Sequence, residues 1–122
     1  MARKVKSTAT VPVEWINWKF IACHEKLEES FIRKYVEHFN FEDISKYQKL
    51  SEDFIREFEN DLNWYIISWK QKLSESFIRE FKDKVVWNCI FGYQKTTKKF
   101  QKEFDKQYQK YLKSKQQWMN CE

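Results

Sequence analysis

The side chains that most often carry enzyme chemistry are few in this sequence and poorly spaced for it. Cys23 and His24 adjoin, but His38, Cys89 and Cys121 follow at irregular intervals. A zinc site needs paired ligands at short, regular spacing. The single glycine of the chain also excludes a phosphate-binding loop and a nucleophile elbow, since both need several glycines. We therefore expect no metal ion, no cofactor and no catalysis.

Lysines near aromatic residues offer a second kind of chemistry, which is binding to phosphates. Residues 93–122 carry eight basic and three acidic side chains, whereas residues 27–92 carry ten and thirteen. The lysines of interest are Lys98, Lys99, Lys102 and Lys106, which lie close to Phe100 and Tyr108. Such a pattern can hold nucleic acid, with ammonium groups on the phosphates and rings on the bases. A lysine-rich outer face of a soluble helix is the simpler interpretation.

A repeat of 23 residues organises the chain that must position these side chains. The segment Leu-Ser-Glu-Asp-Phe-Ile-Arg-Glu-Phe at 50–58 recurs as Leu-Ser-Glu-Ser-Phe-Ile-Arg-Glu-Phe at 73–81, and more loosely at 27–35. The second part of the repeat is also in register, in three sets: Trp18, Phe41, Trp64 and Trp87; Ile21, Ile44, Ile67 and Ile90; Lys26, Lys49, Lys72 and Lys95. Repetition at such a period is typical of stacked helical units.

Each repeat predicts two short helices. Ser51 and Ser74 are suitable N-caps for the first helix, although Glu28 and Val86 break the cap pattern elsewhere. The second helix has an asparagine at its N-cap position in three copies: Asn17, Asn40 and Asn63. Phe54 and Phe77 match within the repeat, so we expect both to be buried.

Helices this short are marginal alone and must pack on their neighbours. The sequence therefore predicts an all-α fold of tandem helix-pair repeats, stacked as a small α-solenoid or compact helical bundle. We expect a flexible basic segment at 1–12 and a single domain at 13–122. That domain has a partial repeat at 13–26, full repeats at 27–49, 50–72 and 73–95, and a divergent cap at 96–122. From about Thr97 we expect one longer amphipathic helix that covers the end of the array.

The repeat resembles a short helical repeat that occurs in open reading frames of bacteriophages and large DNA viruses. The matching pattern is Leu-Ser-Glu-x-Phe-Ile-Arg-Glu-Phe, three variable residues, then Val/Leu-Asn-Trp-x-x-Ile-Ser-x-Tyr/Lys-Gln-Lys, and it covers roughly Val13–Tyr108. The resemblance implies a helical repeat fold and a viral or phage source. It provides no catalytic residues to carry over. The departures from the pattern lie at caps and turns, so they concern local geometry: Glu28, Val86, Phe91-Gly92 and Thr96.

Arginines recur in each full repeat, at Arg33, Arg56 and Arg79. Each follows a glutamate by four residues, which favours an ion pair within one helix. The same row could instead grip an acidic partner. Trp69 is the other candidate contact, because Cys23 and Lys46 stand at equivalent positions and the repeat core needs no ring there.

These patterns favour a protein-binding module over an enzyme. Given the resemblance, we expect a phage or viral accessory protein that binds and inhibits a host factor, such as a defence component. The alternative is a nucleic-acid-binding protein that uses its basic termini. The three cysteines form no disulfide framework, and no secretory signal or membrane span is visible, so we expect the host cytoplasm and no membrane partner.

Overall fold

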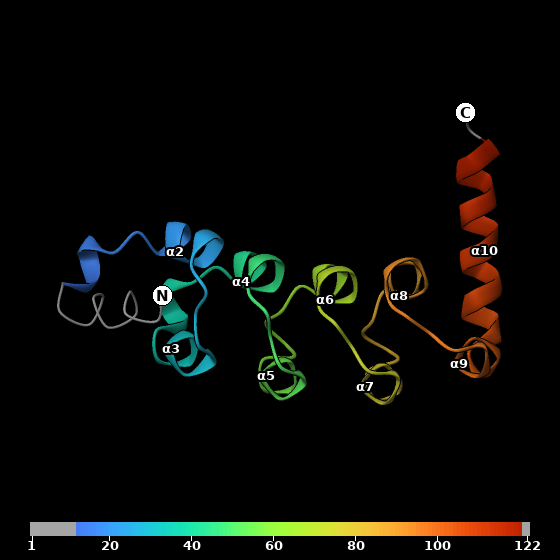
Figure 1. The fold of residues 1–122 in the computed structure, drawn as a ribbon, viewed down its shortest axis with the longest axis horizontal. Helices are drawn as coiled ribbons and strands as arrows, with labels where there is room; N and C mark the ends of the chain where they lie inside the picture. Colours follow the sequence, from blue (N-terminus) through green and yellow to red (C-terminus); the bar gives the residue numbers. More distant parts are fainter. Residues whose placement is uncertain (1–11, 121–122) are drawn as a thin grey trace. The chain divides into compact units, whose positions relative to one another are not determined.

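The structure is a computed structural model that describes residues 12–120 and the side chains of residues 12–117 (Figure 1). Within that range every regular element is a helix, and none is long and apolar enough to cross a membrane. The domain expected at 13–122 consists of two compact halves, of which the N-terminal half ends at Asn63 and the C-terminal half begins at Trp64. The expected flexible segment 1–12, apart from Pro12, lies outside the described residues.

Over its described residues, the N-terminal half contains four short α-helices and two 3-10 helices. Its elements are η1 (Val13–Trp15), α2 (Trp18–His24), α3 (Glu29–Lys34), η2 (Val36–His38), α4 (Phe41–Tyr47) and α5 (Glu52–Glu57). The second helices of successive repeats, α2 and α4, pack against each other. Trp18 anchors this half, because its ring stacks on His38 at 4.6 Å and meets the edge of Phe39 at 5.1 Å.

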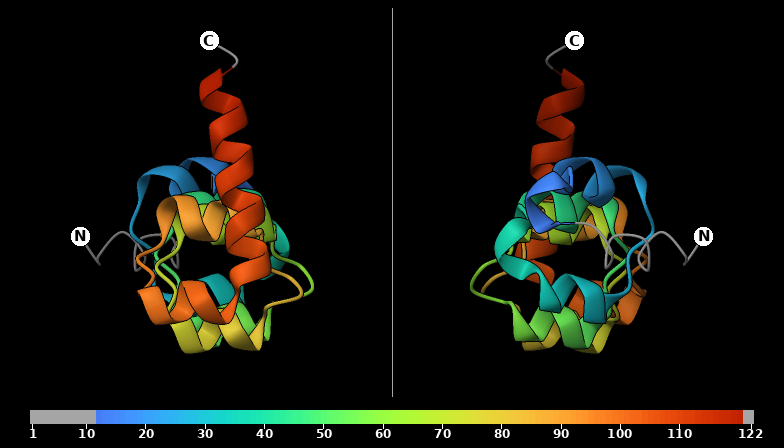
Figure 2. Two further views of the ribbon diagram at one scale, coloured as in Figure 1. Left: turned by 90° about the vertical axis from the view of Figure 1, so that its right-hand side faces the viewer. Right: turned by 90° about the vertical axis from the view of Figure 1, so that its left-hand side faces the viewer.

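The C-terminal half repeats this arrangement and adds a longer helix. Its elements are α6 (Trp64–Lys70), α7 (Glu75–Glu80), α8 (Trp87–Tyr93), α9 (Lys98–Glu103) and α10 (Asp105–Asn120). Helix α6 packs against α8, and α10 packs against both α8 and α9. Beyond α8, the C-terminal part of α10 extends away from the other helices of this half (Figure 2).

Four of the predicted side-chain caps are confirmed, at Asn17, Asn40, Ser51 and Ser74. The hydroxyls of Ser51 and Ser74 accept hydrogen bonds from the amides of Phe54 and Phe77, at 3.1 and 3.2 Å. The second-helix caps are confirmed at Asn17 and Asn40. As the sequence indicated, Glu28 and Val86 make no side-chain cap. These N-caps fix the residue at which each short helix begins and so keep the repeats in register.

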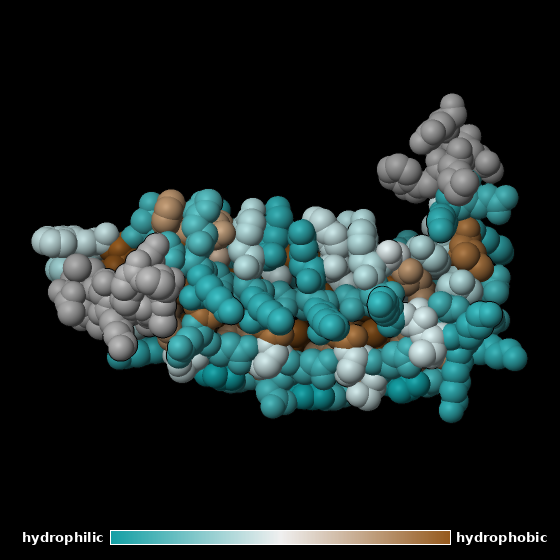
Figure 3. Space-filling view, in the orientation of Figure 1, coloured by the Kyte–Doolittle hydropathy of each residue, from teal (hydrophilic) through white to brown (hydrophobic). Residues whose placement is uncertain are grey.

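The core is built from the repeated apolar positions. Phe54 and Phe77 are both 0% exposed, which confirms the predicted equivalence. Isoleucines recur in both rows of helices and are fully buried, namely Ile32, Ile55 and Ile78 in the first helices and Ile44, Ile67 and Ile90 in the second. On the face shown in Figure 3, many of the apolar residues form a strip between the first and the second helices of each half, among mostly hydrophilic side chains. Burial of the repeated phenylalanines and isoleucines holds each helix pair together.

The sequence predicted one long helix from about Thr97, but the structure has two helices in this segment. Thr97 caps a short helix, α9, through a 3.1 Å bond from the amide of Phe100, just as Ser51 and Ser74 cap theirs. The chain leaves helical geometry at Phe104 and then continues as α10. The expectation of a longer C-terminal capping helix is confirmed for α10, which takes the place of a second helix.

Gly92 allows α10 to lie close against α8. A β-carbon at Gly92 would stand 3.8 Å from the ring of Tyr111 on α10, an ordinary contact distance, but a longer side chain would collide with that ring. Phe91 continues the contact, with its ring centroid 5.0 Å from Tyr108 and 5.9 Å from Tyr111. The departure of the repeat at Phe91 and Gly92 therefore creates the seat of the capping helix.

Candidate functional site

In each half, one glutamine joins two successive repeats. The Gln48 amide donates to the carbonyls of Ala22 and Glu25, at 2.7 and 2.8 Å, and its oxygen accepts from the amide of Leu27 at 3.0 Å. Gln94 makes the same three bonds, to the carbonyls of Ser68 and Gln71 and from the amide of Leu73. The three partners of Gln94 lie two repeat lengths further along the chain than the three partners of Gln48. These glutamines therefore satisfy backbone groups at the end of the preceding second helix.

A glutamate of each preceding repeat supports the next cap. The Glu29 carboxylate accepts from the amide and the hydroxyl of Ser51, at 2.6 and 2.8 Å. Glu75 contacts the amide and the hydroxyl of Thr97 in the same way, at 2.7 and 3.3 Å. Both carboxylates therefore stabilise the start of a neighbouring first helix in addition to their own helix.

The arginine row is engaged within the protein. Arg33 pairs with Glu57 of the next repeat at 2.7 Å, and Arg79 with Glu103 at 2.9 Å. The expected pairs within one helix, with the glutamates four residues earlier, are longer, at 3.8 and 4.0 Å. Arg56 pairs with Asp53 at 2.8 Å. The row therefore consists of side chains that already hold carboxylates, and the two arginines facing the next repeat link successive first helices.

The same two arginines cover buried aromatic rings. The guanidinium of Arg33 lies 5.2 Å from the ring centroid of Phe54, and that of Arg79 lies 5.3 Å from Phe100. A charged partner would have to displace an ion pair and a ring contact to reach either guanidinium. We therefore place Arg33 and Arg79 in the framework of the fold.

Trp69 lies in an aromatic cluster that also includes Tyr65 and Tyr93. The Trp69 ring centroid is 6.4 Å from that of Tyr65 and 6.1 Å from that of Tyr93, and Trp69 itself is half-buried. The tyrosines are 58% and 66% exposed. The Lys70 ammonium lies 4.6 Å from the centroid of the Trp69 ring. The aromatic cluster thus combines a rigid anchor with two rings open to solvent.

A groove of about 500 Å³ runs beside this cluster, in the C-terminal half. Trp69 and Tyr93 form part of its lining, and the residues between α6 and α7 form another part. Three lysines contribute positive charge: Lys70, Lys72 and Lys95. We call this feature the Trp69 groove.

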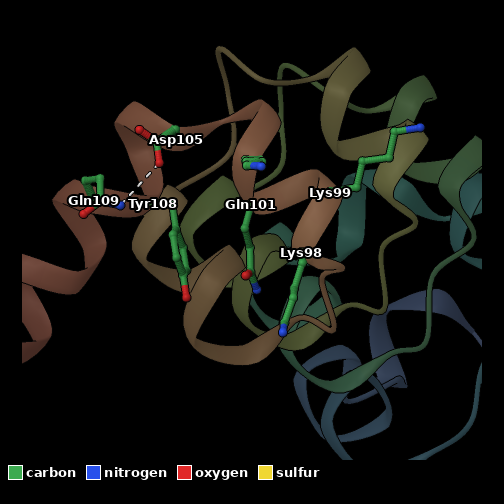
Figure 4. A pocket seen from close by; sticks show the side chains of 7 residues that line it. Lys98, Lys99, Gln101, Asp105, Tyr108 and Gln109 are labelled. Atoms are coloured by element: carbon green, nitrogen blue, oxygen red, sulfur yellow. Dashed lines mark hydrogen bonds between the residues drawn. The ribbon is translucent and has the colours of Figure 1, made fainter.

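The lysines at the C-terminal end line a second groove, of about 540 Å³, between α9 and α10. The structure brings Lys98, Lys99 and Lys102 to this lysine groove, whereas Lys106 is not part of its lining. Tyr108 and Lys98 extend toward the same side, and Lys99 points away from them (Figure 4). The groove also contains the carboxylate of Asp105, which opposes an anion.

The thiols and imidazoles do not assemble. Among residues 12–117, no group of three or more histidine, cysteine or acidic side chains is placed to hold a metal ion. Burial raises the pKa of the Cys89 thiol, so this cysteine stays neutral and packs as an apolar residue. Cys121 lies outside the described residues.

The matching surface of the N-terminal half is different in character. Lys19, at the position equivalent to Tyr65, pairs with Asp43 at 3.2 Å, and this pair raises the pKa of the lysine. Phe20 and His24 contact each other over a shallow hollow of about 260 Å³, and Cys23 holds the position of Trp69. The aromatic cluster is thus a feature of the C-terminal half.

Comparison with known proteins gives no family assignment: no protein-family model, no curated protein and no solved structure matches this chain.

Sequence reasoning found Trp69 but missed its neighbours and the linking glutamines. Tyr65 and Tyr93 were not singled out, because neither is repeated in every copy and periodicity alone does not show which face is open. Gln48 and Gln94 occupy one position of the repeat, and Gln71 at the equivalent position is also buried. The signal that could have identified them is the recurrence of a glutamine just after the second helix of each full repeat.

Proposed function

We propose that this chain is a protein-binding module without catalytic activity, and that its contact surface is the aromatic cluster of the C-terminal half. The observation that carries the proposal is the exposure of Tyr65 and Tyr93 on either side of Trp69. Clustered, solvent-exposed rings are costly on a surface that has no partner. Tyrosine and tryptophan are also the residues that most often dominate binding energy at protein interfaces.

The framework contacts support the assignment of this surface. Each half uses the same glutamine and glutamate bonds, so these residues are needed for the fold itself. The aromatic cluster has no counterpart of that kind at Lys19 and Cys23 of the N-terminal half. A position that the framework leaves free to vary is where a partner-specific contact can be placed.

For the biological setting, we propose an accessory protein of a phage or virus that binds and inhibits a host factor in the host cytoplasm. Support for this setting comes from the likeness of the 23-residue repeat to helical repeats in phage and viral reading frames. A module of this kind acts by occupying a surface of its target, so it needs shape and anchors in place of catalytic groups.

The test is affinity capture from nuclease-treated host lysate, with three baits compared. The wild type and Tyr47→Ala should retain one protein partner, which Trp69→Ala combined with Tyr93→Ala should lose. Tyr47 is the matched control, because it is equivalent to Tyr93 and is 50% exposed. Equal capture by all three baits, or capture that disappears with nuclease, would contradict the proposal.

Nucleic-acid binding is a second candidate function, favoured by the presence of Lys98, Lys99 and Lys102 in the lining of the lysine groove. Binding there depends on phosphate neutralisation. The slope of the logarithm of the binding constant against the logarithm of the salt concentration should therefore become steeper by about 0.7 for each lysine that contacts a phosphate of a single strand. We expect weak binding of oligothymidylate that disappears near physiological salt.

The lysine set and the aromatic set separate the two candidates. Changing Lys98, Lys99, Lys102 and Lys106 together to Gln should abolish oligothymidylate binding and leave capture of the protein partner intact. If the lysine variant instead loses the partner and the aromatic variant keeps it, the binding surface lies on α9 and α10 and nucleic acid becomes the better proposal.

A further inference from the structure

The Trp69 groove has the charge of a site for an acidic segment. Among the described residues, none of its three lysines forms an ion pair with a carboxylate. The single acidic residue in the lining, Glu75, is bonded to the amide and the hydroxyl of Thr97. The groove therefore offers three ammonium groups that are not paired with a carboxylate, and one carboxylate that is already engaged.

Lys70 is held where it can receive a carboxylate. Its ammonium rests 4.6 Å from the centroid of the Trp69 ring, and this contact restricts an otherwise flexible side chain. Lys72 and Lys95 extend from the segments that follow α6 and α8. A charged group that is already positioned loses less entropy when it binds.

The same contact disfavours a nucleobase at this place. Stacking requires an open ring face, but the Lys70 ammonium lies against one face of Trp69, and the neighbouring rings are tilted by 55° and 50°. What remains accessible is the edge of Trp69 and the exposed surfaces of Tyr65 and Tyr93. These suit an aliphatic or phenyl side chain better than a row of bases.

We infer that the Trp69 groove binds an acidic peptide segment of the partner protein, in which one large apolar side chain packs against Trp69 and Tyr93. The flanking carboxylates of that segment pair with Lys70, Lys72 and Lys95. This inference rests on the proposed function and adds the chemical class of the partner. The charge of the lysines and the aromatic anchor act together, so neither alone accounts for the binding.

The probe is a fluorescent peptide of sequence Glu-Asp-Glu-Phe-Leu-Glu-Asp-Glu. Its binding to the full chain is measured by fluorescence anisotropy. Wild-type protein should bind it, and should bind poorly to a peptide with Ser-Ser in place of Phe-Leu or with Lys in place of every acid. Trp69→Ala should weaken binding by about tenfold or more, as expected for an interface anchor. Lys72→Gln combined with Lys95→Gln should also weaken it.

The matched control is Lys26→Gln combined with Lys49→Gln. These lysines hold the equivalent repeat positions in the N-terminal half, so the control removes the same net charge and should leave binding unchanged. Equal loss in both lysine pairs, or equal binding of the Ser-Ser peptide, would show diffuse attraction and overturn the inference. Displacement of the peptide by oligothymidylate through the same residues would overturn it in favour of nucleic acid.

The outcome can be separated from that of the proposed function. If capture of the lysate partner depends on Trp69 but the acidic peptide binds no better than the basic one, only the acidic-segment inference fails. If neither the partner nor the peptide depends on Trp69, the aromatic cluster is not the contact surface and both fail.

Discussion

The two halves share a framework but differ on the exposed side of their second helices. Gln48 and Gln94 make the same three backbone contacts, and Arg33 and Arg79 make the same bond to the next repeat. On the exposed side, the N-terminal half has a Lys19–Asp43 ion pair, whereas the C-terminal half has the aromatic cluster and the seat of α10. The shared contacts specify the fold, and the divergent surface is where we place the function.

The largest effect should come from emptying the shared core. Phe54→Ala and Phe77→Ala each remove a ring that is 0% exposed, and each should lower the free energy of unfolding by roughly 3–5 kcal/mol. Urea denaturation followed by circular dichroism measures this. Equivalent positions should show similar losses, and a loss of a few tenths at either one would mean that its helix does not pack as described.

A smaller loss is expected from the linking glutamines. Gln48→Leu and Gln94→Leu keep the size of the side chain but leave three backbone groups without their bonds, so each should cost roughly 2–3 kcal/mol. Exposed Gln109→Leu is the control and should change stability little. If Gln48→Leu were harmless while Gln94→Leu were costly, the frameworks of the two halves would not be equivalent.

Gly92 sharpens the contrast between the halves, because Lys46 holds the equivalent position. Gly92→Lys should push Tyr111 aside and cost about 1–3 kcal/mol, whereas Gly92→Ala should be tolerated or slightly stabilising. Hydrogen exchange at the amides of α10 reports the docking of that helix directly. Unchanged protection in the lysine variant would show that α10 does not depend on this seat.

The arginines should have the smallest effect. Arg33→Gln and Arg79→Gln each break a partly exposed ion pair, so each should lower the free energy of unfolding by about 0.2–1 kcal/mol. High salt screens the ion pair in the wild type, so the difference between wild type and variant should become smaller there. Partner capture should be unaffected. Loss of capture with intact stability would restore the arginine row to the binding surface.

Much of the fold could be predicted from the sequence because it repeats. The caps at Ser51 and Ser74 and the burial of Phe54 and Phe77 follow from local patterns that recur at a fixed interval. The break at Phe104 was missed, because lysines and aromatics at helical spacing continue across it. Thr97 matches the serine caps and could have indicated that a first helix starts there.

The contacts between repeats were less predictable. The spacing of Glu29 and Arg33 favours a pair within one helix, but the shorter bond of Arg33 goes to Glu57, and only the offset between stacked helices decides this. Trp69 was identified because it departs from its repeat position. The exposure of Tyr65 and Tyr93 depends on which side of α6 and α8 stays uncovered, and periodicity does not determine that.

The most direct test exchanges the divergent surface for its counterpart. Trp69→Cys combined with Lys70→His places on the C-terminal half the residues that the N-terminal half carries at Cys23 and His24. The affinity of the captured protein partner is then compared with that for wild type, with unfolding curves recorded for both. Binding reduced by about tenfold or more at nearly unchanged stability is the predicted result. Full affinity in the exchanged variant would contradict the assignment of function to the aromatic cluster.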